Sequence, residues 1–299
     1  MMDGVYAAIS GLEANQTMLN VTANNLANVN TVGYKGAGIT FSDSLTNITR
    51  GAAGPTPSLG GTNPIEVGLG VQVSAIDPNM GSGTLQPTGN PLDVAVEGNG
   101  FLRVGNGTPP TAAPYTSGVP TTFDYTRAGN LTTDAQGFLT TQAGQYVVGR
   151  NAVATTTGGT TTYAPGTTDT YLNIPTGSAN IAIGTDGSVN YTDENSSSST
   201  YGQTVTAGYL SLATFPNQDG LQRVGTSNWI ATQNSGTPTV GTPGTGGFGP
   251  TIGGQLEQSN VDLASDMSQM ITAQNGYDAN SRVIQTADAM LQTLMQAIQ

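Results

Sequence analysis

The stretch that decides the fold is MDGVYAAISGLEANQTMLNVTANNLANVN, residues 2–30. Stepping along it by three and four gives a mostly apolar series with a polar break and a polar end: Met2, Val5, Ile9, Leu12, Gln16, Leu19, Ala23, Leu26 and Asn30. This repeat predicts a helix over residues 2–30 that packs against a partner helix. At 1.5 Å per residue, the helix would be about 42 Å long, and Gly33 is placed to end it.

The C-terminal end carries the same stepping, so it is the nearest candidate partner for the first helix. Its positions are Leu263, Met267, Met270, Gln274, Tyr277, Ser281, Ile284, Asp288, Leu291, Met295 and Ile298. Ser259-Asn260-Val261-Asp262 fits a capping pattern, which predicts a helix that begins near Ser259. We expect residues 1–35 and 253–299 to form a coiled-coil-like inner domain.

Between the helices the sequence predicts an extended connector and then a β domain. Closely spaced Gly and Pro in residues 36–75 exclude a lasting helix. In residues 76–252, short β-prone runs alternate with turn signals, and Asp186-Gly187 is the strongest hairpin signal. Trp229 and Phe215 are expected in the core. The predicted class is therefore α+β, with paired terminal helices, extended Gly/Pro linkers and an antiparallel all-β outer domain.

Three stretches rich in Thr, Ser, Gly and Pro are expected to be surface loops: residues 105–120, 152–165 and 196–199. The only adjacent acidic pair, Asp193-Glu194, borders the last of them, so we expect a solvated loop there and no acid–base site. Gly98-Asn99-Gly100 does not continue as a nucleotide-binding glycine motif. No catalytic, cofactor-binding or metal-binding residue is predicted.

Composition points in the same direction. The chain has no Cys and no His, which removes thiol and imidazole chemistry and the usual zinc ligands. The formal net charge is −12 and no basic run exists, so nucleic acid and anionic membrane are not expected partners. Only 9% of residues are charged, so copies of the chain can approach one another with little charge repulsion. We expect a protein that is not an enzyme and has no cofactor.

The helices could pair only within one chain, or they could also assemble with further copies. Apolar residues outside the main series, such as Met290 and Leu294, favour further copies. The Asn residues near the end of the first helix could fix the register of neighbouring helices or simply cap the helix. The expected interface residues are Val5, Ile9, Leu12, Leu19, Ala23, Asn24, Asn25, Leu26, Asn28, Leu263, Met267, Met270, Tyr277, Ile284, Leu291, Met295 and Ile298.

Four segments resemble the axial proteins of the bacterial flagellar rod and hook. The first is Ile9-Ser10-Gly11-Leu12 together with residues 23–35, which end in Gly33-Tyr34-Lys35. The others are residues 60–71, residues 92–101, and the run that starts at Ser259 and continues to Ser281. Together they cover both ends and part of the middle of the chain.

This resemblance implies a protein that polymerises into a hollow tube whose inner layer is the paired terminal helices. It implies export through the flagellar type III apparatus without a cleaved signal peptide, and an extracellular place in the flagellum. The implied partners are copies of the chain, other axial proteins (rod, hook–filament junction and hook cap) and the export apparatus. Residues 39–45 and 63–71 favour a short hook protein, a flexible joint that transmits torque.

Two alternatives to the hook remain open. The first is the distal rod of the basal body, a rigid drive shaft in which residues 36–70 would hold subunits stiffly together. The second is an extracellular β domain that binds or degrades polysaccharide.

Overall fold

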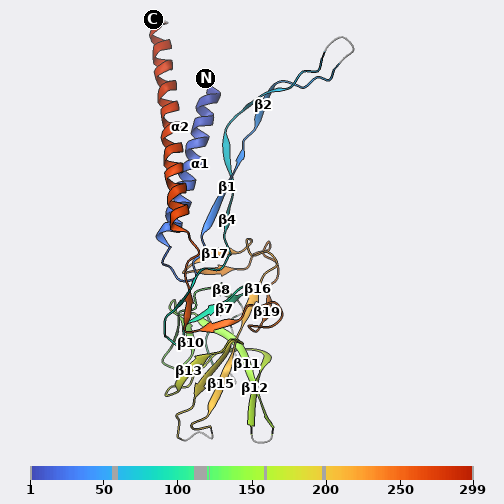
Figure 1. The fold of residues 1–299 in the computed structure, drawn as a ribbon, viewed down its shortest axis with the longest axis vertical. Helices are drawn as coiled ribbons and strands as arrows, with labels where there is room; N and C mark the ends of the chain where they lie inside the picture. Colours follow the sequence, from blue (N-terminus) through green and yellow to red (C-terminus); the bar gives the residue numbers. More distant parts are fainter. Residues whose placement is uncertain are drawn as a thin grey trace. The chain divides into compact units, whose positions relative to one another are not determined.

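The computed structural model describes residues 2–55, 60–110, 120, 122–157, 160–196 and 200–297. A long helix lies near each end of the chain, α1 (Met2–Ala27) and α2 (Leu263–Ala297), and strands fill the interval (Figure 1). The chain divides into two compact units. The helical unit comprises Met1–Val29, Gly36–Asn79 and Val261–Gln299, and the β unit comprises Asn30–Lys35 and Met80–Asn260. The predicted α+β class is confirmed.

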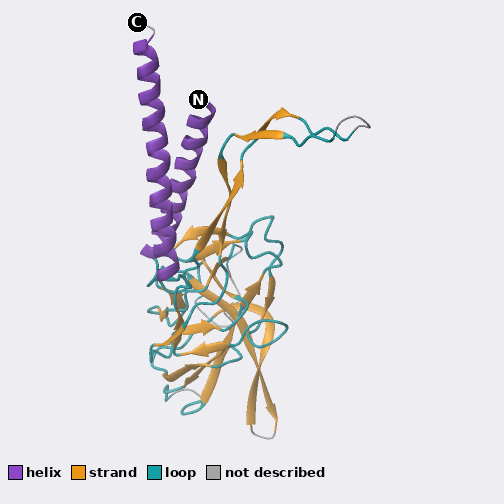
Figure 2. Ribbon diagram, turned by 45° about the horizontal axis from the view of Figure 1, so that its top comes forward, coloured by secondary structure: helices purple, strands orange, loops and turns teal. Residues whose placement is uncertain are grey.

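In the helical unit, α1 and α2 lie side by side (Figures 1 and 2). Next to them, the segment that we expected to be an extended connector forms two antiparallel ribbons. The first pairs β1 (Ala37–Asp43) with β4 (Val71–Pro78), and the second pairs β2 (Thr46–Arg50) with β3 (Ile65–Gly68). Pairing satisfies the backbone groups of a segment whose Gly and Pro residues prevent a helix.

The first helix is shorter than expected. It ends at Ala27. The side-chain amide of Asn28 donates to the Asn24 carbonyl oxygen at 2.9 Å, and this local bond competes with the backbone bonds that would continue the helix. Gly33, expected to end the helix, lies in the β unit. Its φ of 64° suits glycine, and its N–H donates to the Glu257 carbonyl oxygen at 2.8 Å.

The last helix begins later than expected, at Leu263 and not near Ser259. Its cap is Asp262, whose Oδ1 accepts from Ala264 N at 2.9 Å and from Ser265 N at 3.3 Å. Residues 259 and 260, which come before this cap, belong to the β unit, where the Asn260 side-chain amide donates to the Gly81 carbonyl oxygen at 2.9 Å.

The β unit is built on one antiparallel sheet of 13 strands with the central order β13-β14-β15-β11-β7-β8-β18-β17. Short strands pair outside it, β20 with β6 and β21 with β5. The strands of this unit are β5 (Leu85–Pro87), β6 (Val94–Val96), β7 (Phe101–Gly105), β8 (Asp124–Thr126), β9 (Leu131–Thr133), β10 (Leu139–Thr141), β11 (Tyr146–Thr157), β12 (Thr160–Tyr171), β13 (Ala179–Ile183), β14 (Ser188–Thr192), β15 (Thr204–Leu210), β16 (Leu212–Thr214), β17 (Gln222–Gly225), β18 (Asn228–Ile230), β19 (Thr239–Gly241), β20 (Thr251–Gly253) and β21 (Gln255–Glu257).

Two buried clusters form the core of the β unit, and β7 contributes to both. Leu102 belongs to the larger cluster and Phe101 to the smaller, because successive side chains of a strand point to opposite faces. The smaller cluster also holds Phe215 and Trp229, so the expectation for these two aromatic residues is confirmed. The rings of Tyr125 and Phe215 pack edge to face, with 4.8 Å between the ring centroids.

The Asp186-Gly187 hairpin is confirmed, since β13 and β14 pair antiparallel around it. The loop expected at residues 152–165 is wrong: Ala152 pairs with Pro165 in the long β11–β12 hairpin. Threonine is β-branched and favours strands, which the low-complexity composition concealed. Most of the loops expected at 105–120 and 196–199 lies outside the described residues.

Candidate assembly interface

Small side chains make the contact between α1 and α2. Ala8 and Ala14 on α1 and Ala273 on α2 are buried. A Cβ atom added at Gly11 would lie 2.5 Å from the Asn280 amide nitrogen, and one added at Gly276 would lie 2.7 Å from the Asn15 amide oxygen. The two helices therefore approach so closely that a larger residue at either glycine would require the facing Asn side chain to move.

This seam is displaced by one residue from the series that the sequence indicated. The seam positions Ala8, Gly11, Asn15, Thr22 and Asn25 immediately precede Ile9, Leu12, Gln16, Ala23 and Leu26. On α2, Asp266, Ala273, Gly276 and Asn280 immediately precede Met267, Gln274, Tyr277 and Ser281 in the same way. One residue turns a helix by about 100°. The larger apolar residues thus face away from the centre of the seam, on an adjacent flank.

The expected interface residues consequently differ in exposure. Asn25 is buried. Those that are half-buried are Val5, Leu12, Leu19, Leu26, Asn28, Met270 and Ile284. Those that are exposed are Ile9, Ala23, Asn24, Leu263, Met267, Tyr277, Leu291 and Met295. Ile298 lies outside the described residues.

Large apolar side chains are exposed along α2. Met267 is 46% exposed, Met295 is 68% exposed, and Met290 and Leu294 are exposed as expected from their place outside the apolar series. Between α1 and α2, a cavity of about 210 Å³ is lined by Gly4, Val5, Val283, Thr286, Ala287 and Met290. The helix pair thus buries small residues along part of its seam and leaves apolar surface uncovered on its flanks.

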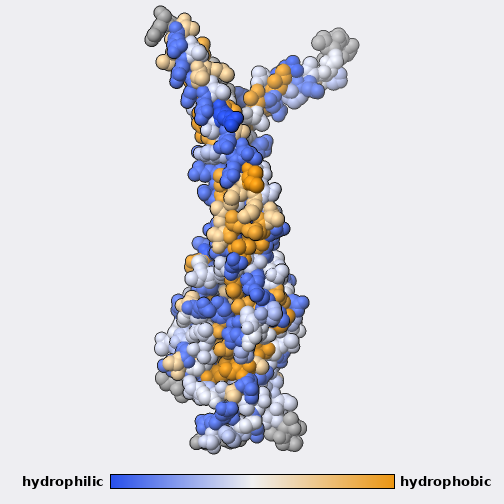
Figure 3. All heavy atoms as spheres, turned by 60° about the vertical axis from the view of Figure 1, so that its left-hand side comes forward, coloured by the Kyte–Doolittle hydropathy of each residue, from blue (hydrophilic) through white to orange (hydrophobic). Residues whose placement is uncertain are grey.

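The β2–β3 ribbon is a second uncovered apolar surface in the helical unit. Every residue of both strands is exposed, including Ile48, Ile65 and Val67. The hydrophobic atoms stand out in orange along this ribbon in Figure 3. A two-stranded ribbon is at best marginally stable alone in water, so a covering surface would stabilise it.

The three Asn residues near the end of α1 have different roles. The Asn25 amide pairs with the backbone of Ala37, donating to its carbonyl oxygen at 2.9 Å and accepting from its N–H at 3.0 Å. Asn25 therefore fixes the start of β1 against α1. Asn28 bonds instead to the Asn24 backbone, which is local capping.

In the β unit, one carboxylate gathers two buried cations. Glu257 Oε1 accepts from Lys35 Nζ at 2.6 Å and from Gly83 N at 2.8 Å, and Oε2 accepts from Arg127 Nη1 at 3.2 Å. The side chains of Lys35 and Glu257 are fully buried. Burial lowers the pKa of the Lys35 ammonium, and Glu257 opposes that effect. This cluster joins four segments that are distant in the sequence.

The side chain of Arg223 contacts residues 30–35, the first segment of the β unit. The Arg223 guanidinium lies 4.6 Å from the centre of the Tyr34 ring and 4.8 Å from that of Trp229, and it donates to the Lys35 carbonyl oxygen. Cation–π contacts of this kind stabilise by about 0.5–2 kcal/mol each. Residues 30–35 are thus an integral part of the β unit.

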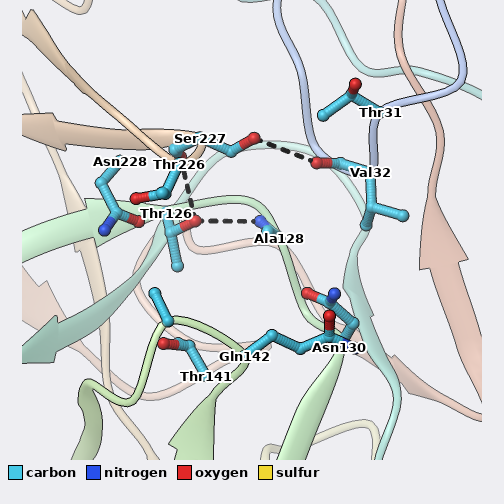
Figure 4. A pocket seen from close by; sticks show the side chains of 11 residues that line it. Thr31, Val32, Thr126, Ala128, Asn130, Thr141, Gln142, Thr226, Ser227 and Asn228 are labelled. Carbon is cyan, nitrogen blue, oxygen red and sulfur yellow. Dashed lines mark hydrogen bonds between the residues drawn. The ribbon is translucent and has the colours of Figure 1, made fainter. Parts of the chain in front are cut away.

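The β unit also contains a cavity of about 350 Å³ lined by uncharged residues (Figure 4). At its edge, Thr226 and Ser227 have φ angles of 50° and 59°, which are strained for residues with side chains. Ser227 Oγ donates to the Val32 carbonyl oxygen at 3.3 Å, and Thr126 Oγ1 donates to that of Ser227 at 3.0 Å. This lining offers hydrogen bonds but no group for acid–base catalysis.

The solvated loop expected at Asp193-Glu194 is wrong for Asp193, whereas Glu194 is exposed. Asp193 is buried to 9% exposure, accepting from Asn195 N at 2.9 Å and from Thr200 Oγ1 at 2.6 Å. The sequence reasoning missed the seam residues Ala273 and Gly276 and the Lys35–Glu257 pair. Alanine and glycine three residues apart would have indicated the seam, whereas no local pattern links residues 222 positions apart.

Neither helix of the described chain is long and apolar enough to cross a membrane. Three families match the sequence. Residues 5–35 match "Flagella basal body rod protein", residues 95–191 match "Flagellar hook protein FlgE/F/G D1 domain", and residues 252–297 match "Flagellar basal body rod FlgEFG protein C-terminal". The first match covers most of α1 and residues 30–35 of the β unit, the second lies within the β unit, and the third runs from the end of the β unit through α2.

Curated relatives are similar over nearly the whole chain. The "Flagellar basal-body rod protein FlgG" of Bacillus subtilis is 37% identical over 298 residues, covering 99% of this chain and 98% of that protein. The protein of the same name from Caulobacter vibrioides is 34% identical, covering 99% of each. The "Flagellar hook protein FlgE" of Borreliella burgdorferi is 26% identical, also covering 99% of each. The chain belongs to the family of flagellar basal-body rod and hook proteins, whose members are structural components of the flagellum.

Proposed function

We propose that this protein is the distal rod subunit of the bacterial flagellum, which polymerises into a stiff hollow tube. The observation that carries polymerisation is the exposed apolar surface on a helix pair that buries small residues along part of its own seam. Such a surface is stabilised when further copies cover it. A contact between identical copies that does not close on itself generates a helical polymer.

The choice of rod over hook rests on the relatives. The rod proteins reach 37% identity, against 26% for the hook protein, and the alignment to the hook protein needs 453 positions where that to the rod protein needs 298. We expected the hook from residues 39–45 and 63–71, and the relatives favour the rod alternative. A polysaccharide-binding role gains no support from them.

In this proposal, α1 and α2 form a coiled-coil-like inner layer. We expected residues 1–35 and 253–299 to supply it, but residues 30–35 and 253–260 belong to the β unit, so the layer is left to residues 1–29 and 261–299. Copies of the chain are the first partner, and other axial proteins of the rod, the hook, the hook cap and the hook–filament junction are the next. The subunit reaches the extracellular structure through the flagellar export apparatus without a cleaved signal peptide. It needs no cofactor, and nucleic acid and membrane are not partners.

The β2–β3 ribbon is our candidate for the stiffening contact. Its apolar residues are exposed in the single chain, so a neighbouring copy would cover them and hold the ribbon in place. A ribbon fixed between copies resists sliding, whereas a free one permits it. The Gly/Pro linkers would then be held by neighbours in a rod and would remain loose in a hook.

Electron microscopy of the polymer tests both parts. Leu291→Asp should abolish polymerisation because it places a charge on the exposed flank of α2, while Leu291→Met, the matched control, should polymerise. Far-UV circular dichroism of both monomers should match the parent chain. The parent polymer should be straight, and Ile48→Ser combined with Val67→Ser should lower its bending rigidity. Polymerisation of the Leu291→Asp variant, or a curved parent tube, would contradict the proposal.

A further inference from the structure

One buried carboxylate in the helical unit has an oxygen without a partner. Asp266, in the first turn of α2, is 8% exposed. Among the described residues, its Oδ2 atom is buried and accepts no hydrogen bond. Buried polar groups are nearly always paired, so this exception calls for a reason.

The surroundings of Asp266 compensate its charge only in part. From α1, the Asn25 amide hydrogen-bonds to the Asp266 side chain, and Asn25 is itself held by the backbone of Ala37 at the start of β1. The one charged group acting on Asp266 is Asp262, the cap of α2, and it is also acidic. Neither Asn25 nor Ala37 brings a charge. In the part of the chain that the structure describes, no lysine or arginine acts on the Asp266 carboxylate, so burial disfavours its ionised form.

We propose that Asp266 is a proton-operated latch between α1 and α2: the ionised carboxylate keeps the helix pair loose, and proton uptake at Oδ2 closes it. The neutral form removes the buried charge and the repulsion by Asp262. It also converts Oδ2 into a hydroxyl that can donate a hydrogen bond. The bond from Asn25 remains in both forms.

The direction of the pH dependence follows from linkage. Burial raises the pKa of the Asp266 carboxyl, the Asn25 amide opposes this rise, and Asp262 adds to it. A carboxyl with a raised pKa binds more protons in the paired state than in the open state. The helix pair is therefore most stable below the ordinary aspartate pKa and loses that stability as pH rises through the raised value.

This inference rests on the proposed function for its consequence. A subunit that must reach its place as a single copy benefits from helices that do not pair firmly beforehand, because premature pairing exposes a finished flank to other copies. Once neighbouring copies cover the helices, their contacts offset the cost of the buried charge. The latch thus delays helix closure until assembly.

The test is amide hydrogen exchange in the first two turns of α2, measured on monomeric full-length chain. Asp266→Asn imitates the protonated form, and Asp278→Asn removes an exposed charge from the same helix as the matched control. At about pH 8, the parent chain should exchange about threefold or more faster than Asp266→Asn, and below the ordinary aspartate pKa of about 3.9 the ratio should approach one. Taking the ratio at each pH removes the intrinsic pH dependence of exchange. Asp278→Asn should behave as the parent does.

A ratio that stays the same at both pH values would overturn the latch, and so would an Asp278→Asn variant that behaves like Asp266→Asn. If Asp266→Asn does not fold, Asp266→Ser takes its place, and the ratio of the exchange rate of the parent to that of Asp266→Ser decides. Because the measurement uses single chains, it remains decisive even if the protein forms no rod. Failure of polymerisation and failure of the latch are thus separate results.

Discussion

Replacing Glu257 by Gln should unfold the β unit at a much lower temperature. The change keeps the shape of the side chain and an oxygen that can accept from Gly83 N, but it removes the carboxylate that Lys35 and Arg127 share. Lys35 and Arg127 would then lie beside each other without a counter-charge, with side chains that are 0% and 2% exposed.

The size of the loss follows from this burial. Breaking a buried ion pair on one side costs about 3–5 kcal/mol in free energy of unfolding. In a domain of this size, 1 kcal/mol lowers Tm by about 2–4 °C, so Tm should fall by about 6–20 °C. Lys35, whose pKa is already lowered by burial, can release its proton in the variant. The stability of the variant then rises with pH up to the ordinary lysine pKa. The difference in Tm between the variant and the parent should therefore narrow between about pH 7 and about pH 9.

Calorimetry and the fluorescence of Trp229, the single tryptophan, report this unfolding, since Trp229 lies in the β unit. Glu97→Gln is the matched control because Glu97 is exposed, and its effect should stay within about 0.5 kcal/mol. A loss below about 1 kcal/mol for Glu257→Gln would refute the reasoning, because it would show that the two cations do not depend on the carboxylate.

Three further results are expected. Gly33→Ala should destabilise the β unit by about 1–3 kcal/mol in thermal unfolding, since its Cβ would lie 2.5 Å from Ala128 N at a φ of +64°, whereas Gly4→Ala, in open space on α1, should not destabilise the protein. Ala273→Leu should cost the helix pair about 1–3 kcal/mol, seen as earlier melting of helical circular dichroism, because Ala273 is 0% exposed and the seam has no room. Burial raises the pKa of Tyr125, Tyr171 and Tyr209. The stability that these neutral tyrosines contribute below about pH 10 should therefore be lost at higher pH, and ultraviolet absorbance should show the three phenols ionising together with unfolding and not before it.

Much of the fold could be predicted from the sequence, because its main signals are local. The three-and-four stepping gives the helices, and Asp186-Gly187 gives a hairpin. The seam between the helices was misplaced by one residue for a physical reason. A search for large apolar side chains selects positions that cover surface, while two backbones approach most closely where side chains are small, as at Gly11 and Gly276.

Other features could not be found because they depend on distant residues. Lys35 is the only lysine of the chain, and nothing near it in sequence indicates Glu257 as its partner. The same holds for Asn25, whose partners are the backbone of Ala37 and the side chain of Asp266. Composition also misled at β11–β12, since runs of threonine and glycine fit both a loop and an exposed hairpin.

The path of the chain bears on how the protein can be cut into pieces. Because residues 30–35 belong to the β unit and residues 36–79 return to the helical unit, the polypeptide crosses between the units four times. A fragment that starts at Met80 would lack Tyr34 and Lys35, leaving Arg223 without one of its stacking rings and Glu257 without its ammonium. A trimmed core fit for crystallisation therefore has to begin no later than Asn30, and it retains both ribbons.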